Sequence, residues 1–316
     1  MNEKKRIVTM ATTIDFAQWQ QERVKHFEWV AQTKCPVAGR EPRILAGAMR
    51  YAVLGGGKRI RPLFAYATGL LSQAKTRTVD AVAFALEAIH SYSLVHDDMP
   101  CMDNDTLRRG QPTVHVQYGR AMAMLAGDAL QPLAFARIAK VSRDPAIVVR
   151  LMQTLTHAAG YLGMCGGQAL DLAMVGQTNV DELTLWRMQS MKTGALIRAA
   201  VLMGAQSGRA YEAWSERAKS ALVIYAQAIG LAFQVVDDIL DCTQSTEVLG
   251  KTAGKDEDNH KPTWVSILGL DGAKAKAQRL EKEALMALRM LDERLGLQEG
   301  TVYLRAIAQI VLQRTH

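Results

Sequence analysis

The 316-residue chain is long enough to bury a large core, as one big domain or two small ones. Apolar residues make up 49% of the chain and charged residues 22%, a balance that excludes a globally disordered protein. The excess of 38 Lys and Arg over 31 Asp and Glu favours an anionic partner. Because these charges are scattered, we expect small phosphorylated ligands and no nucleic acid.

Cysteine usage and the N-terminal sequence favour a cytoplasmic protein. The four cysteines have no metal-ligand spacing, and a chain of this size needs no disulfide bonds, so we expect reduced thiols. The residues that follow the basic segment at 4–6 are too polar for a signal peptide. The longest apolar stretch, residues 221–236, is shorter than the ~20 residues of a transmembrane helix, so it predicts a buried core helix and no membrane span.

The pattern along the chain predicts an all-α protein. Residues 1–14 are expected to form a loosely ordered extension, and residues 15–316 a single helical domain. Apolar residues recur at helical spacing from Asp15 onward, and no segment alternates as a strand does. Later helices are predicted at about 114–140, 145–174, 181–204, 210–240 and 261–315.

Proline, glycine and capping residues mark the expected helix ends in the first third of the chain. Pro42 opens a helix, the glycines at 55–57 end it, and Pro62 lies where the first turn of the next helix begins. Thr78 is expected to cap a long helix that ends at about Asp98.

Two clusters of aspartates close two long apolar helices. They are Asp97, Asp98 and Asp103 in the first and Asp237, Asp238 and Asp241 in the second. Carboxylates are disfavoured at a helix C-terminus, which carries about −0.5 charge, and adjacent carboxylates repel one another. A solvated acidic surface explains a single pair, but two such clusters indicate a bound cation, and clustered oxygen ligands suit Mg²⁺.

The spacing within each cluster supports shared ligation of a metal. Asp237 and Asp241 are four residues apart, so they share one helix face. Pro100 cannot continue the first helix, and the chain is expected to bulge there and bring Asp103 back beside Asp97.

Short basic segments are candidates for binding a diphosphate. Gly57, Lys58 and Arg61 lie between two helices, where glycines allow close approach to a ligand and the helix N-terminus attracts anions. A helix end followed by ordinary surface cations is the alternative. Arg108 and Arg109 follow the first acidic cluster, where they either bind phosphate or form ion pairs with aspartates.

Further polar residues stand at unusual places in the pattern. Residues 192–194, Lys-Thr-Gly, fall inside a predicted helix, where glycine costs ~1 kcal/mol relative to alanine, so a local break with a functional use is expected. Lys251 and Lys261 flank a loop after the second acidic cluster. His90 lies seven residues before Asp97, two turns away on the same helix face, and taken alone suits a buried structural histidine.

At these residues the chain closely resembles the trans-isoprenyl diphosphate synthases, and within them the bacterial-type farnesyl diphosphate synthases. The resemblance covers about residues 40–265, and the longer spacing within the first aspartate cluster is similar to the bacterial and plant-type subgroup. The matching segments, in the family's order, are GGGKRIRP (55–62), HSYSLVHDDMPCMDNDTLRRG (90–110), LAGDALQ (125–131), GGQALD (166–171), MKTGAL (191–196), GLAFQVVDDILD (230–241) and LGKTAGKD (249–256).

This resemblance implies long helices around a deep central cavity, usually in a homodimer. It also implies condensation of isopentenyl diphosphate with dimethylallyl and geranyl diphosphates to give (2E,6E)-farnesyl diphosphate. Three Mg²⁺ ions are expected, two on Asp97 and Asp103 and one on Asp237, and Asp98, Asp238 and Asp241 are expected as indirect or alternate ligands. Among the protein side chains, catalysis is expected to depend most on Asp97, Asp103, Lys192, Asp237 and Lys251.

The same resemblance implies two diphosphate sites. The allylic diphosphate is expected to bind to Arg108, Lys192, Thr193, Gln234, Lys251 and Lys261. Isopentenyl diphosphate is expected on Gly57, Lys58, Arg61, His90 and Arg109.

Tyr92 and Ser93 are expected to limit the length of the product. They precede Asp97 by five and four residues, and five helical residues correspond to ~7.5 Å of depth along the axis. A large ring at this depth is similar to the stop of a farnesyl-type enzyme, and an ordinary core aromatic is the alternative. Geranylgeranyl and geranyl diphosphate synthases of the same family remain alternative functions.

Two departures and several rival functions complete the prediction. Residues 262–265, Pro-Thr-Trp-Val, differ from the family's usual run after Lys261, and the C-terminal residues resemble the family's basic tail only loosely. The His96-Asp97 pair also suits a helical metal phosphohydrolase, which would act on one substrate alone. A terpene cyclase would lack the isopentenyl site, and a non-catalytic partner subunit would lack one of the aspartate clusters.

Overall fold

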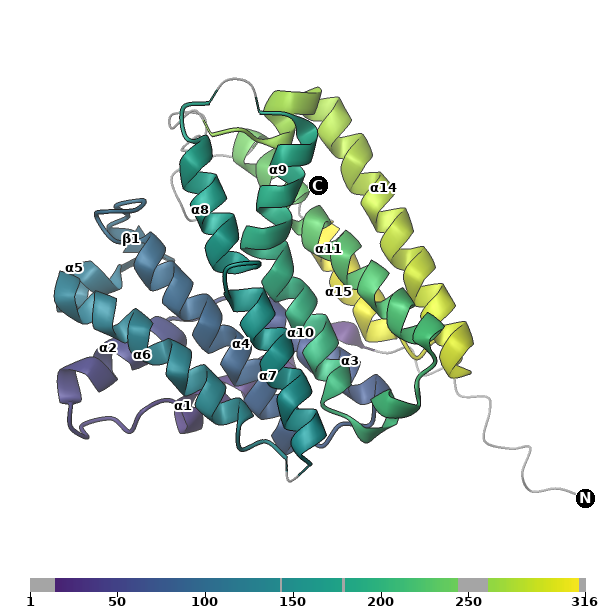
Figure 1. Ribbon diagram of the computed structural model, residues 1–316, viewed down its shortest axis with the longest axis horizontal. Coiled ribbons are helices and arrows are strands. Elements are labelled where there is room, and N and C mark those ends of the chain that lie inside the picture. Colours follow the sequence, from purple (N-terminus) through teal and green to yellow (C-terminus); the bar gives the residue numbers. More distant parts are fainter. Residues whose placement is uncertain (1–14, 143, 178–179, 244–260, 313–316) are drawn as a thin grey trace, which may run out of the picture.

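The computed structural model describes residues 15–142, 144–177, 180–243 and 261–312, and in these ranges the protein is almost entirely helical (Figure 1). The predicted all-α class is therefore confirmed. The α-helices are α1 (Phe16–Lys34), α2 (Arg43–Leu54), α3 (Ile60–Leu71), α4 (Thr76–Asp97), α5 (Val114–Tyr118), α6 (Arg120–Ile138), α7 (Pro145–Ala159), α8 (Met164–Met174), α9 (Glu182–Gln189), α10 (Ala195–Gln206), α11 (Glu216–Thr243), α14 (Trp264–Leu295) and α15 (Val302–Leu312).

Three short elements join these helices. A π-helical turn, η2 (Ser190–Gly194), connects α9 to α10, and a 3₁₀ turn, η3 (Arg209–Ala213), precedes α11. Strands β1 (Leu107–Arg108) and β2 (Gln111–Pro112) pair antiparallel in a small hairpin after α4. The predicted N-terminal extension at 1–14 lies outside the described residues.

Capping explains several helix starts, although two predicted helices prove to be interrupted. Asp15 accepts a bond from the Gln18 amide at the start of α1, and Asp144 accepts one from Ala146 at the start of α7. The predicted helix at 114–140 breaks at Gly119, whose φ of +84° only glycine adopts readily. The helix at 145–174 breaks between α7 and α8, where a Cβ on Gly163 would lie 2.2 Å from the Ala158 carbonyl oxygen.

The predicted cap at Thr78 is wrong. Helix α4 already begins at Thr76, after Lys75 in an extended conformation, and no side chain caps it. Thr78 is instead buried within the first turn, where its hydroxyl donates to the Val141 carbonyl at 3.5 Å. A threonine in this place binds a neighbouring segment instead of the helix end, and the sequence pattern does not distinguish the two uses.

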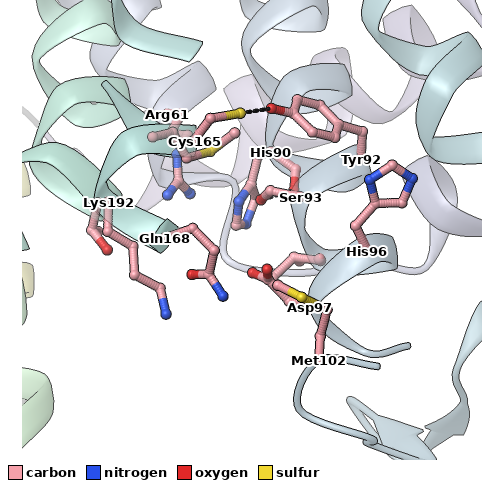
Figure 2. Close-up of a pocket in the computed structure, with 13 residues that line it drawn as sticks. Arg61, His90, Tyr92, Ser93, His96, Asp97, Met102, Cys165, Gln168 and Lys192 are labelled. Carbon is pink, nitrogen blue, oxygen red and sulfur yellow. Dashed lines mark hydrogen bonds between the residues drawn. The ribbon is translucent and has the colours of Figure 1, made fainter. Parts of the chain in front are cut away.

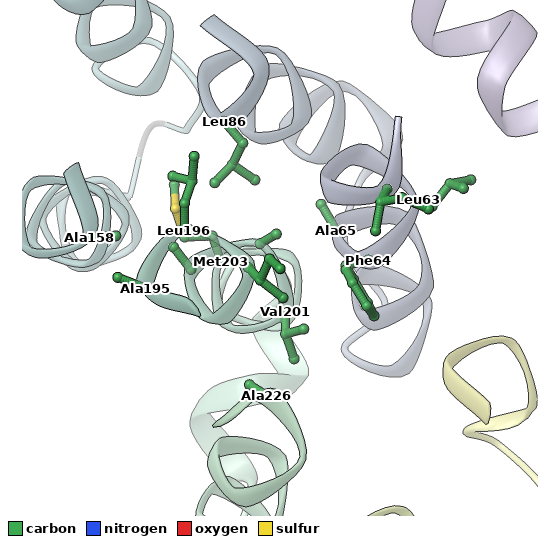
Figure 3. Packing of buried hydrophobic residues seen from close by; sticks show 14 of the residues in the cluster. Leu63, Phe64, Ala65, Leu86, Ala158, Ala195, Leu196, Val201, Met203 and Ala226 are labelled. Carbon is green, nitrogen blue, oxygen red and sulfur yellow. The ribbon is translucent and has the colours of Figure 1, made fainter. Parts of the chain in front are cut away.

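Helix α10 lies at the centre of the core. Figure 3 shows its Leu196, Val201 and Met203 surrounded by side chains of α3, α4, α7 and α11, and all three are fully buried. A Cβ on Gly204 would lie 2.1 Å from the Thr68 hydroxyl oxygen, so glycine allows α10 to approach α3 closely. Because α10 begins directly after η2, this packing fixes the position of the η2 turn.

Helix α11 runs beside α14 along one edge of the molecule (Figure 1). Among the described residues it is the helix whose length and composition would allow it to cross a membrane, but more than half of its most apolar stretch is buried inside the fold. The Tyr225 hydroxyl, also buried, donates to the Leu304 carbonyl of α15 at 2.9 Å. These contacts are those of the predicted core helix.

Buried Arg59 holds the loop between α2 and α3 in place. Its φ of +50° is left-handed, and its guanidinium binds Glu28 at 2.7 Å, Glu87 at 2.9 Å and the Val53 carbonyl at 2.9 Å. Both Arg59 and Glu87 are 3% exposed. One cation thus ties α1, α2 and α4 to the start of α3, where the predicted isopentenyl site lies.

We expect Arg59→Ala to lower the free energy of unfolding by about 3–5 kcal/mol, because it leaves the Glu87 carboxylate buried without its partner. Arg43→Ala is the matched control, since Arg43 pairs with Glu41 on the surface and should contribute less than about 1 kcal/mol. Urea unfolding of both variants measures the difference. Equal losses in the two variants would contradict this role of Arg59.

Candidate active site

The first aspartate cluster surrounds the end of α4. Asp97 is the last residue of the helix, and the following loop turns back so that the Asp103 amide donates to the Asp97 carbonyl at 2.8 Å. The predicted return of Asp103 to Asp97 is therefore found in the structure. The side chain of Asp97 faces a cavity of about 280 Å³ (Figure 2).

Asp98 points away from this cavity and binds Arg108 of the β1–β2 hairpin. The guanidinium Nε lies 2.8 Å from Asp98 Oδ2, and Nη2 lies 2.5 Å from Oδ1. Asp98 is 2% exposed, and its pKa is raised mainly by burial and lowered in part by Arg108. The adjacent carboxylates of Asp97 and Asp98 thus have different surroundings, one facing the cavity and the other holding the hairpin.

In the second cluster, at the end of α11, Asp238 also holds neighbouring elements. Asp238 accepts bonds from Gln189 Nε2 at 3.1 Å and from the Trp264 amide at 2.8 Å, so it joins α11 to α9 and to the start of α14. Asp237 lies near enough to Arg61 to raise the pKa of that guanidinium, although burial, the larger effect, lowers it overall. Gln234 lies half-buried one turn earlier on α11.

Lysine side chains link the first cluster to Asp171 of α8. Lys261 Nζ lies 3.6 Å from Asp103 Oδ1 and 3.4 Å from Asp171 Oδ2, and Lys192 Nζ lies 2.7 Å from the same Asp171 oxygen. Lys261 is only three residues before Trp264, whose amide binds Asp238. The two aspartate clusters therefore lie in one connected polar region, and Lys261 reaches it despite the unusual sequence that follows. Lys251 lies outside the described residues.

The η2 turn presents Lys192 and Thr193 to the cavity. A π-turn inserts an extra residue into a helix, and such turns are frequent at functional sites. Glycines bring two other helices close to it: a Cβ on Gly167 would lie 2.1 Å from the Lys192 nitrogen, and one on Gly230 would lie 3.2 Å from the Gly194 Cα. The break predicted at 192–194 is present, and the glycines of the neighbouring helices, Gly167 and Gly230, allow the close packing around it.

A second group of predicted residues gathers around the start of α3. The Arg109 side chain lies on Gly57, where a Cβ would come within 2.7 Å of its Cζ, and it donates a hydrogen bond to the Gly56 carbonyl. Arg61 Nε is buried and has no hydrogen-bond partner among the described residues. Lys58 stands exposed on the same loop. Cations held this close together need an anion between them.

His90 is neutral in this surrounding. Burial lowers its pKa well below the usual value, and the nearby Arg61 and Arg109 lower it further. Desolvation is also the main reason for the lowered pKa values of Arg61 and Arg109 themselves. The region is thus a desolvated, positively charged pocket that a bound diphosphate would neutralise.

The cavity joins these groups to an apolar end. Figure 2 shows Asp97, Lys192 and Gln168 at one end and Tyr92 with Cys165 at the other. The predicted residues that line it are Arg61, His90, Tyr92, Ser93, Asp97, Lys192 and Thr193. Met102, Met164 and Leu94 add apolar surface, as a hydrocarbon chain requires.

Two polar residues of α8 were not identified from the sequence. Both amide atoms of Gln168 are buried on the cavity wall without a hydrogen-bond partner among the described residues. Asp171, 6% exposed, binds Lys192 and Lys261. They are three residues apart, so they share a helix face, and this spacing within GGQALD was the available signal.

The electrostatics of Asp97 fit a bound divalent cation. Burial raises its pKa to about 6, with a further contribution from Asp103 that outweighs that from Asp98, while Lys192 lowers it in part. No three carboxylate, His or Cys groups among the described residues form a complete metal site by themselves. Mg²⁺ suits this arrangement, because it usually takes one or two carboxylates and completes its shell with water and substrate phosphates.

Comparison with known proteins identifies the family. Residues 42–290 match the sequence model of the polyprenyl synthetase family. The chain is 47% identical over 275 residues to a farnesyl diphosphate synthase of Escherichia coli K12, an alignment that covers 84% of this chain and 88% of that protein. The chain therefore belongs to the polyprenyl synthetase family, as its resemblance implied.

Solved structures agree with this assignment. The fold matches an FPP/GFPP synthase of Zymomonas mobilis with a TM-score of 0.82 and 39% identity, covering 95% of this chain and 99% of that one. A geranyltransferase of Helicobacter pylori, complexed with magnesium and isoprenyl diphosphate, matches with a TM-score of 0.82 and 32% identity, covering 96% and 100%. The architecture is the all-α trans-prenyltransferase fold.

The raised pKa of Asp97 predicts a pH-dependent instability of the metal-free protein. Between about pH 4 and 6 the folded state binds more protons at Asp97 than the unfolded state, whose carboxyl titrates near 3.8, so stability falls as pH rises. In EDTA at neutral pH, Asp97→Asn should melt about 2–6 °C higher than the wild type, and the gap should close near pH 4.

Asp128→Asn is the control for the loss of one negative charge, because Asp128 is an exposed carboxylate on α6. Melting curves of the wild type and of Asp97→Asn that stay parallel from pH 4 to neutral pH would show that Asp97 is not destabilised by its surroundings.

Proposed function

We propose that the chain is a farnesyl diphosphate synthase. It condenses isopentenyl diphosphate with dimethylallyl and then geranyl diphosphate, head to tail, to give (2E,6E)-farnesyl diphosphate. The observation that carries this proposal is the single cavity with Asp97 and Lys192 at one end and buried Tyr92 at the other (Figure 2). A charged end and an apolar end bounded by a buried ring suit a diphosphate joined to a growing hydrocarbon chain.

The aspartate clusters hold the metals in this proposal. Asp97 and Asp103 bind two Mg²⁺ ions and Asp237 a third. Asp98 and Asp238 act indirectly, because their oxygens already hold Arg108 and Trp264, and Asp241 is an alternate ligand. Bound Mg²⁺ supplies positive charge that stabilises a departing diphosphate.

Two groups of residues, each containing several cations, bind the two substrates at separate places. Lys192, Thr193, Arg108, Gln234, Lys251 and Lys261 bind the allylic diphosphate, and Asp171 keeps the Lys192 and Lys261 ammonium groups in position. Gly57, Lys58, Arg61, His90 and Arg109 bind isopentenyl diphosphate. Arg61 and Arg109 neutralise its charge, while neutral His90 can donate one N–H without adding to the repulsion between the guanidinium groups.

The reaction uses the protein as a positioning and electrostatic device. The allylic C–O bond breaks, the diphosphate leaves with the electron pair, and the isopentenyl double bond attacks the resulting allylic cation. A proton is then lost to the released diphosphate, so no protein nucleophile is needed. Met102, Met164 and Leu94 exclude water that would trap the cation.

Geranyl or geranylgeranyl diphosphate synthesis is the second candidate, since members of one fold differ in product length. The large ring of Tyr92 at the closed end favours the farnesyl product. We further propose that the enzyme is a cytoplasmic homodimer. A metal phosphohydrolase is disfavoured by the second group of cationic side chains, Arg61 and Arg109, which a single-substrate hydrolase does not need.

Purified protein supplied with Mg²⁺, isopentenyl diphosphate and dimethylallyl diphosphate tests the function. We expect a C15 product by chromatography, and no turnover when either diphosphate is omitted. Phosphate release from one diphosphate alone would instead support the hydrolase, and a C10 or C20 main product would change the assignment within the family.

Tyr92→Ala should lengthen the product, because it removes the ring that closes the cavity. We expect the main product to change from C15 to C20 or longer in the same assay, with the total rate of isopentenyl incorporation reduced by less than about tenfold. Tyr211→Ala is the control for the loss of a tyrosine ring, because Tyr211 lies in the η3 turn, outside the cavity lining. An unchanged C15 product from Tyr92→Ala would exclude Tyr92 as the limit on chain length.

A further inference from the structure

Tyr92 of α4 and Cys165 of α8 meet across the cavity. The Tyr92 hydroxyl lies 3.1 Å from Cys165 Sγ, and both side chains line the end of the cavity opposite Asp97 and Lys192, where Tyr92 is buried and Cys165 is exposed (Figure 2). The two residues are 73 positions apart in the chain, so this contact joins two separate walls. Neither the resemblance nor the spacing of motifs gave Cys165 a role.

The hydrogen bond to Cys165 Sγ sets the position of the Tyr92 hydroxyl. Tyr92 is 5% exposed, and its hydroxyl makes no other hydrogen bond among the described residues. Burial raises its pKa, so the phenol keeps its proton and can donate to sulfur. The other close neighbour is the His96 ring, which meets Tyr92 edge-on with centroids 5.8 Å apart. That contact allows the ring to pivot, whereas the bond to sulfur sets where its hydroxyl end lies.

Cys165 is a fixed point because its helix is wedged in place. A Cβ on Gly166 would lie 1.9 Å from the Tyr161 carbonyl oxygen, and one on Gly167 would lie 2.1 Å from the Lys192 nitrogen. These close approaches leave α8 no room to shift toward its neighbours. The sulfur therefore stands at a defined distance from the η2 turn that carries Lys192.

We propose that Cys165 is a specificity-determining residue that positions the Tyr92 ring across the cavity and so limits the length of the product. This inference rests on the proposed function, in which Tyr92 closes the cavity. Without the bond to sulfur, the ring turns toward α4 more often, and a C15 chain can extend past it and undergo another condensation.

The test compares five variants with geranyl and isopentenyl diphosphates and measures the C20:C15 ratio. Tyr92→Phe removes the hydroxyl and keeps the ring. Cys165→Ala removes the sulfur, and Cys165→Ser keeps a hydrogen-bonding atom of similar size. The double variant joins Tyr92→Phe with Cys165→Ala. Cys35→Ala controls for the loss of a thiol as such, because Cys35 lies at the end of α1, outside the cavity lining; unlike Cys165 it is buried.

We expect Tyr92→Phe and Cys165→Ala each to raise the C20:C15 ratio about two- to fivefold, as the loss of one hydrogen bond implies. The double variant should equal either single variant, because both remove the same bond. Cys165→Ser should restore the wild-type ratio, and Cys35→Ala should not change it. Melting temperatures within a few degrees of the wild type separate these effects from loss of folding.

Several outcomes would overturn the inference, and they differ from failure of the proposed function. An equal C20:C15 ratio in Cys165→Ala and in the wild type would exclude Cys165 as a positioning residue. Tyr92→Ala could still lengthen the product in that case, so the proposed function would stand. A double variant whose C20:C15 ratio rises by the product of the two single increases would show that the two side chains act independently. A Cys165→Ser ratio equal to that of Cys165→Ala would show that the sulfur acts through its volume and not through the hydrogen bond. An unchanged product from Tyr92→Ala would end both the inference and the assigned role of Tyr92.

Discussion

The structure depends on charges held in places that the free protein does not stabilise. The guanidinium groups of Arg61 and Arg109 are desolvated near each other, and Asp97 is buried near Asp103. Each group alone costs free energy, because ions lose hydration on burial and like charges repel. A bound anion would offset the loss of hydration and the repulsion between the guanidinium groups, and a bound divalent cation would do the same for the carboxylates. A site that is unfavourable when empty therefore gains most from a ligand that carries a diphosphate with its metals.

Adjacent aspartates supply a way to build such a site at a helix end. Consecutive residues on a helix point in directions about 100° apart, so a pair cannot face the same ligand equally. Asp97 faces the cavity while Asp98 holds Arg108, and Asp238 holds Gln189 and the Trp264 amide. Asp98 and Asp238 thus secure the surrounding structure, whereas Asp97, the neighbour of Asp98, faces the cavity.

Features that depend on local sequence could be predicted, and those that depend on contacts between distant segments could not. The helix starts near residues 15 and 145, the return of Asp103 to Asp97 and the break at 192–194 follow from local periodicity, proline and glycine. The cap at Thr78 was wrong because its partner, the Val141 carbonyl, lies 63 residues away. Asp171 was missed for the same reason, since its meaning comes from Lys192 and Lys261.

Helix α4 relates the three parts of the site to one another. His90, Tyr92 and Asp97 lie on this one helix, so the proposed isopentenyl site, the proposed length gate and the proposed metal ligand have a fixed spacing. Five residues separate Tyr92 from Asp97, which is ~7.5 Å along the axis. A substitution on α4 can change which side chain stands at that depth, but not the depth itself. Finer adjustment must come from the opposite wall, and α8, fixed by its glycines and carrying Cys165 and Gln168, is the helix placed to provide it.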